Sequence, residues 1–292
     1  MRNLAAVLLS VVLVGGCSAL AESAPSAHPS PTTAAVTTST PAASQAPTAT
    51  LAPTATPGAS PSAAPSAGPT PVPTASPTPG PTLPAREAFQ VNLYRKGAFV
   101  SQLTDYFCLP AAMQTMINIM TDGRMDTTFE TQDRLHTLAR TFLIEPYSGK
   151  KGAQPEGWAE GLNAEGYGPY ALAVRPTRME AIHLAAYQLR ATGRPVGLLA
   201  WRGAHAWVMS GFKSDADPLL FDDFNVTHAW IEDVWYPRVS SIWGESTPPD
   251  TLYAVEDLRV DFLRYNRPRH DYPDKDGQFV MIVPLLPEQA GV

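Results

Sequence analysis

Between residues 110 and 192 the hydrophobic positions repeat with the period of an α-helix. From Pro110 to Met120 the apolar residues recur every three or four positions, the spacing of one helix face. Similar patterns cover residues 130–142, 155–165 and 178–192, each broken by Gly or Pro. Pro110 suits a first helical turn, because its missing N–H group would have no partner there. We therefore expect a helix in each of these segments.

After Pro195 the pattern changes to short segments rich in β-branched and aromatic residues and bounded by turn formers, as is typical of strands. The segments are PVGLLAW (195–201), HAWVMSGF (205–212), VTHAWIED (226–233) and QFVMIVPLL (278–286). Helical patterns come first and strand patterns follow. This order favours an α+β domain in which a helical half packs against a mostly antiparallel sheet.

The N-terminus follows neither pattern. Residues 1–17 hold one basic residue and then an apolar run that is too short to span a bilayer and has the form of a secretory signal. The run ends in LVGGC, which resembles the lipobox of bacterial lipoproteins, where the cysteine is lipidated. We expect an extracytoplasmic protein anchored to the bacterial cell membrane through Cys17. Cleavage after the ALA at 19–21, which would release a secreted protein, is the alternative.

Residues 18–85 are almost wholly Ala, Pro, Ser and Thr, with Glu22 as the only charge. Such a segment has too little apolar surface to offset the entropy lost on ordering, so we expect a disordered spacer. Its closely spaced prolines favour extended conformations of about 3.1 Å per residue, and the spacer would reach on the order of 200 Å when fully extended.

Residues 86–292 contain all six Trp, all ten Tyr and all ten Phe, and we expect them to form one globular domain. The formal net charge of the chain is −6. The domain carries that whole charge, since the preceding region holds one basic and one acidic residue. This balance gives no support for nucleic-acid binding.

Cys17 and Cys108 are the only cysteines. If Cys17 is removed or lipidated, Cys108 has no thiol to pair with and lacks the companions of a thiolate zinc site, so we expect no metal and no cofactor. Cys108 is then either a small buried hydrophobe or a nucleophile. Its place at a predicted helix start favours the nucleophile, because unpaired N–H groups and the positive helix end stabilise a thiolate.

A catalytic thiolate needs a base and a donor for the developing oxyanion. His205 opens a predicted strand, directly after Gly203 and Ala204, whose small size leaves room around its ring. Asp233 ends the next strand, and neighbouring strands should bring its carboxylate within hydrogen-bonding reach of His205. Gln102, six residues before the cysteine, can donate a side-chain N–H beside the backbone N–H of Cys108. Taken singly, each of these residues also has an ordinary structural interpretation.

Together the four residues resemble the pattern of papain-like cysteine peptidases. The segments YFCLPAAMQTM, HAWVMSGF and DVWYP are most similar to the bacteriocin-processing (double-glycine leader) peptidases and their stand-alone relatives. The resemblance covers about residues 102–237. It implies a papain-like fold with Cys108 as nucleophile, His205 as base, Asp233 as orienting acid and Gln102 as oxyanion donor.

The chain departs from that family pattern at three positions. Leu109 and Ala204 stand where Gly is usual, and Val234 stands where Pro is usual. The leader peptidases are usually fused to a transporter, and since this chain holds no transporter segment, we do not expect cleavage of double-glycine leaders.

These features predict a surface-tethered thiol hydrolase, a cysteine peptidase that acts on peptide or protein substrates. An amidase of cell-wall peptides would use the same chemistry, and the long spacer fits it at least as well. The alternative from another class is a non-catalytic binding module that keeps the fold and exposes Trp201, Trp207 and Trp243 to a partner. Sequence motifs of serine hydrolases, zinc peptidases and phosphate-binding loops do not occur.

Overall fold

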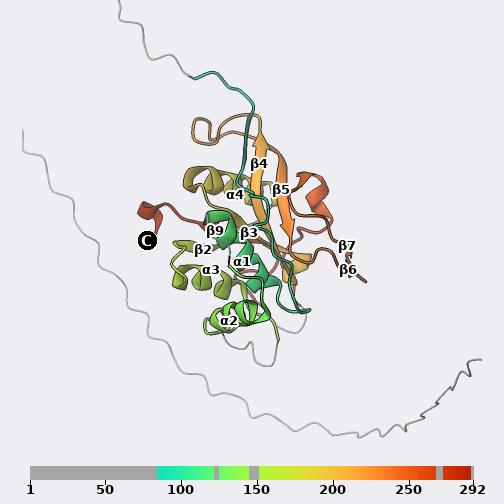
Figure 1. Ribbon diagram of the computed structural model, residues 1–292. Helices are drawn as coiled ribbons and strands as arrows, with labels where there is room; N and C mark the ends of the chain where they lie inside the picture. The colour runs from blue at the N-terminus through green and yellow to red at the C-terminus, as the bar shows by residue number, and fades with distance from the viewer. Residues whose placement is uncertain (1–83, 122–124, 145–150, 268–271, 291–292) are drawn as a thin grey trace, which may run out of the picture. The chain divides into compact units, whose positions relative to one another are not determined.

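A seven-stranded antiparallel sheet lies at the centre of the part of the chain that the structure, a computed structural model, describes (Figure 1). The described residues are 84–121, 125–144, 151–267 and 272–290. The strands follow the order β2, β9, β3, β4, β5, β8, and β1 also pairs with β4. Their bounds are β1 Phe89–Asn92, β2 Tyr170–Arg175, β3 Val196–Ala200, β4 His205–Ser214, β5 Val226–Asp233, β8 Thr251–Ala254 and β9 Phe279–Pro284. A separate hairpin consists of β6 Val239–Ser240 and β7 Gly244–Glu245.

Helices cover both faces of this sheet. The first three helices gather on one face and the fourth lies on the other (Figure 1). In β3, Leu199 packs with α1–α3 whereas Leu198 packs with α4, because successive side chains of a strand point to opposite faces. The helix bounds are α1 Cys108–Met120, α2 Phe129–Arg140, α3 Pro155–Ala164 and α4 Arg178–Thr192. Single-turn segments lie at Trp201–Gly203, Asp257–Arg259 and Pro287–Gln289.

The ends of α4 and α1 are built differently. At the start of α4, the Thr177 side chain accepts the Glu180 N–H and the Glu180 carboxylate accepts the Thr177 N–H, a reciprocal capping box. The helix stops at Gly193, which adopts a left-handed φ of 65°. At the start of α1, Phe107 provides no side-chain cap and the first turn holds no acidic residue. The first N–H groups of α1 are therefore left without a capping side chain.

The predicted α+β organisation is confirmed at the level of elements. The four predicted helices and the four predicted strands match α1–α4 and β3, β4, β5 and β9 to within two residues at nearly every end. The expectation that helices come first and strands later was wrong, because β1 precedes α1 and β2 lies between α3 and α4. The strands β1, β2 and β8 each pair with a single neighbour. They are partly exposed and carry no buried apolar run. Strands of this kind lack a strong hydrophobic pattern.

The predicted signal segment, residues 1–17, lies outside the described residues, as does nearly all of the predicted spacer. In the described ranges, no helix combines the length and the apolar character that crossing a membrane requires.

Candidate active site

Cys108 is the first residue of α1 and is partly buried against the core that α1 forms with α2 and α3. Because no side chain caps this end of the helix, its N–H groups and the positive end of the helix dipole act on the Cys108 sulfur without a competing acceptor from the cap position. This is the environment in which a thiolate is stabilised.

His205 is the first residue of β4, and its side chain is 2% exposed. Its Nε2 atom lies 2.7 Å from Oδ1 of Asp233. Cys108 lines the same cleft and interacts electrostatically with the ring, and Nδ1 is the ring nitrogen that Asp233 leaves unoccupied. The Oδ1 atom of Asp233 accepts a second hydrogen bond, of 2.9 Å, from the Trp235 N–H. His205 therefore bridges the thiol and a fixed carboxylate.

The strand register explains why His205 and Asp233 meet. β4 and β5 are antiparallel neighbours, and Trp207 lies directly opposite Asp233. His205 is two residues before Trp207 and so shares its face of the sheet, which makes His205 the diagonal neighbour of Asp233. Asp222 and Asp223 are exposed, and Asp223 is bonded to Arg86 at 2.7 Å. The expectation that Asp233, and not this pair, contacts His205 is confirmed.

Burial and charge act in opposite directions on His205. Burial is the largest single influence and lowers the pKa of the ring, but the hydrogen bonds and electrostatic attraction of Asp233 and Cys108 raise the pKa to about 9 overall. The raised pKa favours the protonated ring at neutral pH. An imidazolium has N–H donors on both nitrogens, so it can donate to Asp233 and to Cys108 at the same time.

Tryptophan side chains surround His205. The Trp201 ring stacks on the His205 ring with centroids 4.0 Å apart and planes inclined by 21°, and Trp235 approaches edge-on at 6.3 Å. Trp243 stacks on Trp201 at 5.8 Å. Both Trp201 and Trp207 are buried, so they do not form the exposed aromatic surface that the binding-module alternative requires. Sequence reasoning missed the contact of Trp201 with His205, although Trp201 stands only four residues away.

Gln102 is buried, but the structure gives no contact between its side chain and Cys108. Its Nε2 donates to the Thr104 carbonyl at 2.6 Å, and its Oε1 atom is buried with no hydrogen-bond partner. The Gln102 backbone N–H donates to the Val234 carbonyl at 2.9 Å, which ties the segment before α1 to the end of β5. The structure therefore brings together Cys108, His205 and Asp233, and the oxyanion role of Gln102 stays a prediction.

A cleft of about 240 Å³ opens beside Cys108 and His205. Its lining includes three tyrosines, two basic residues and a loop before α3; these are Tyr106, Tyr265, Tyr272, Lys151, Arg267 and residues 152–154. The acidic side chain on the cleft wall, Asp105, is ion-paired with Arg238 at 3.1 Å. The cleft is large enough for a short stretch of peptide and carries basic groups beside the protonated His205.

The three residues that depart from the family pattern occupy the core or the cleft wall. Leu109 is 4% exposed and packs in the core around α1, and Val234 is fully buried in the same core. Ala204 is exposed on the cleft wall.

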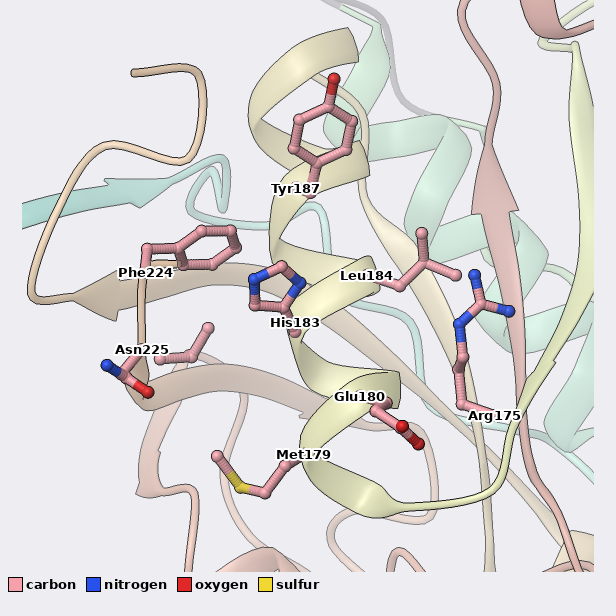
Figure 2. Close-up of a pocket in the computed structure, with 9 residues that line it drawn as sticks. Arg175, Met179, Glu180, His183, Leu184, Tyr187, Phe224 and Asn225 are labelled. Carbon is pink, nitrogen blue, oxygen red and sulfur yellow. The ribbon is translucent and has the colours of Figure 1, made fainter. Parts of the chain in front are cut away.

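A second hollow, of about 520 Å³, lies between α4 and residues 224–226 (Figure 2). Its histidine, His183, stacks on Phe224 at 4.0 Å and its Nε2 lies 3.0 Å from the carbonyl of Asp222. Glu180 belongs to the capping box of α4. With no cysteine on its wall and a backbone carbonyl in place of an acid beside the histidine, this hollow does not share the chemistry of the cleft at Cys108.

No protein-family model matches the chain, and no curated protein matches it. Among solved structures, the peptidase domain of Streptococcus ComA, a bifunctional ABC transporter involved in a quorum-sensing pathway, aligns with 64% of this chain and 97% of its own at 12% identity and a TM-score of 0.33. UfSP from C. elegans aligns with 65% of this chain and 32% of its own at 13% identity and a TM-score of 0.38. TM-scores this low do not establish a shared fold, so the chemistry of the cleft is derived from its own geometry.

Proposed function

We propose that the protein is a papain-like cysteine peptidase whose triad is Cys108, His205 and Asp233. The observation that carries the proposal is the single buried ring of His205, which is hydrogen-bonded to Asp233 and interacts electrostatically with Cys108 at the uncapped start of α1, on the same cleft. A core histidine that serves only packing needs neither a buried acid nor a thiol as its partner. Nucleophile, base and orienting acid in hydrogen-bonding sequence are the signature of covalent acyl transfer.

The first half of the reaction forms a thioester. The Cys108 thiolate attacks the carbonyl carbon of the scissile amide, and the carbonyl oxygen takes the negative charge. The backbone N–H of Cys108 stabilises this oxyanion, and Gln102 assists through the second hydrogen of the same amide that donates to Thr104. The His205 imidazolium then gives its Nδ1 proton to the leaving amine as the C–N bond breaks.

The second half releases the acid. Neutral His205 takes a proton from water, and the resulting hydroxide attacks the thioester carbon. The C–S bond breaks, the carboxylic acid leaves, and Cys108 and His205 return to the ion pair. Asp233 keeps the ring oriented throughout, because it holds Nε2 while Nδ1 exchanges its proton.

The substrate class that fits best is a peptide or protein segment lying across the tyrosine-lined cleft. A cell-wall peptide amidase is a second candidate of the same chemistry, and it is favoured by the lipobox-like LVGGC and the long Pro-rich spacer of the sequence. In both cases the catalytic domain acts outside the cytoplasm and is tethered to the membrane through Cys17.

Labelling of the full chain by a thiol-directed covalent peptidase inhibitor tests the proposal. At near-neutral pH we expect one adduct, located at Cys108 by mass spectrometry and lost in Cys108→Ala. His205→Ala should label at least tenfold more slowly, because the base contributes about 10²–10⁴ to such reactions. Equal labelling of the wild type and His205→Ala would reject the triad, and a reactive Cys108 without hydrolysis of any peptide library would reject the peptidase.

A further inference from the structure

The connection between β3 and β4 holds Trp201 in an unusual backbone conformation. Trp201 and Arg202 have φ angles of 53° and 58°, and Gly203 has a φ of 82°. Left-handed φ values are rare for residues with side chains and rarest for bulky ones. Gly203 has a second reason to be glycine, since a Cβ atom there would lie 2.3 Å from the Tyr265 ring. Two consecutive strained residues persist only where surrounding contacts hold them.

Asp261 supplies two of those contacts. Its backbone carbonyl accepts the Trp201 N–H at 2.8 Å, and its Oδ1 atom accepts the indole Nε1–H at 3.0 Å. The Asn266 N–H donates to the Arg202 carbonyl at 3.2 Å from the same C-terminal segment. One residue thus fixes both the backbone and the ring of Trp201, although 60 positions separate the two in the sequence.

The fixed indole has one consequence at the candidate active site. Its face covers the His205 ring at a centroid distance of 4.0 Å, whereas Asp233 binds the edge of that ring at Nε2. The face of an indole attracts cations, so the stack favours the protonated form of His205 over the neutral form. A carboxylate that accepts the indole N–H polarises the ring and strengthens that attraction.

We propose that Asp261 and Trp201 are a second positioning unit for His205: Asp261 locks the indole, and the indole holds the imidazolium with Nδ1 directed at Cys108 and Nε2 at Asp233. The unit rests on the proposed role of His205 as the base. It explains why the chain accepts backbone strain beside β4, because only a left-handed turn with this anchor sets the indole face on His205. Trp201 and Asp261 act through His205 and touch no reacting atom.

Several ionisable groups from different elements surround His205. Asp233 is hydrogen-bonded to the ring, and Cys108 and Asp261 interact with it electrostatically. Burial raises the pKa of Asp261, while the Trp201 hydrogen bond and the charge of His205 oppose that rise. The charged and phenolic residues along the cleft are Asp105, Lys151, Arg267, Tyr106, Tyr265 and Tyr272. The experiment therefore compares variants that leave this set unchanged except at Asp261.

The test is an NMR titration of the His205 ring in the full chain, with the signal assigned through His205→Ala. Trp201→Leu should lower the pKa of His205 by about one unit, a tenfold fall in the ratio of protonated to neutral ring at a given pH. Asp261→Asn keeps an acceptor for the indole but removes the charge, and Trp201→Phe keeps a smaller aromatic face. Both should give shifts in the same direction and smaller than that of Trp201→Leu.

Two matched variants serve as controls. Trp243→Phe alters an indole that stacks on Trp201 and not on His205, and Arg202→Gly relieves a left-handed residue without touching either ring. Both should leave the pKa of His205 unchanged. A folded Trp201→Leu chain with an unshifted His205 overturns the proposal, and if that variant does not fold, unshifted Trp201→Phe and Asp261→Asn chains overturn it.

The titration needs no substrate, which separates this inference from the proposed function. A chain without hydrolytic activity in which Trp201 still controls the pKa of His205 would reject the peptidase and keep the positioning unit. If the chain is active but Trp201→Phe and Asp261→Asn change neither that pKa nor the pH profile of kcat, the peptidase is kept and the positioning unit is rejected.

Discussion

The Nε2 atom of His205 lies 2.7 Å from the Oδ1 atom of Asp233, with the two side chains 2% and 3% exposed. A pair this deeply buried loses its hydration, and removal of one partner leaves the other polar group without compensation. The pair therefore differs from the exposed ion pairs of this protein, such as Arg86 with Asp223, which solvent screens. It is the arrangement on which the proposed chemistry of the cleft depends.

Replacement of Asp233 should impair catalysis more than replacement of any other aspartate near β4 and β5. Asp233→Ala removes both the charge and the acceptor at Nε2, and we expect kcat/KM to fall by on the order of 10²–10⁴. Asp233→Asn keeps an acceptor and should lose less. Steady-state kinetics on a peptide substrate measures both, with exposed Asp223→Asn as the matched control. Full activity in Asp233→Ala would show that another group orients His205.

Stability should fall at alkaline pH because of His205. Its folded-state pKa of about 9 is raised above the ordinary value of 6.5, so its contribution to stability is complete below pH 6.5 and is lost as the pH rises through 9. The contribution is on the order of 3 kcal/mol at full strength. Urea unfolding between pH 6 and pH 10 should show this loss in the wild type and a smaller one in His205→Gln. Parallel curves for the two chains would contradict the raised pKa.

Cys108 should be alkylated faster in the wild type than in His205→Ala. The His205 imidazolium and the uncapped start of α1 both favour the charged sulfur, so iodoacetamide should alkylate Cys108 readily at pH 6–7. In His205→Ala the reaction should be slower at the same pH, because the neighbouring positive charge is absent. Mass spectrometry of time points gives the rate. A pH profile identical in both chains would assign Cys108 to packing alone.

The cleft should prefer acidic substrates. Lys151 and Arg267 lie on its wall beside the protonated His205, and the acid on that wall, Asp105, is paired with Arg238. A basic cleft concentrates anionic ligands, so a peptide with Glu near the scissile bond should have a kcat/KM about tenfold above its Lys counterpart at low ionic strength. The Lys151→Ala, Arg267→Ala double variant should lose most of this ratio. Lys213→Ala, whose side chain lies over Trp230, should keep it.

A chain limited to residues 86–292 should fold alone. It keeps Arg86, whose guanidinium bonds Asp215 and Asp223, and it keeps β1, which pairs with β4. We expect a soluble protein with one cooperative thermal transition. Aggregation or the absence of a transition would mean that the preceding region contributes to the fold.

Local signals account for much of what could be predicted. The bounds of α4 follow from Thr177 and Glu180 at its start and Gly193 at its end, all of which act within one helical turn. The contact of His205 with Asp233 was predictable because β4 and β5 are consecutive in the chain, and consecutive strands usually pair. Cys108 was predictable as a helix-start residue from Pro110, which fixes the first turn.

Contacts between distant segments were decided by the tertiary structure alone. No local pattern relates Asp261 to Trp201, or aligns the indole face with His205, because the left-handed turn is stable only with that distant anchor in place. The orientation of Gln102 likewise depends on Thr104 and on the end of β5, so its amide direction was not contained in its spacing from Cys108. The sequence by itself determined which residues were candidates for the site and which elements hold them, since propensity and capping act over a few residues. The packing of the sheet decided which faces of those residues meet, since only long-range contacts can hold a strained turn or a buried charge in place.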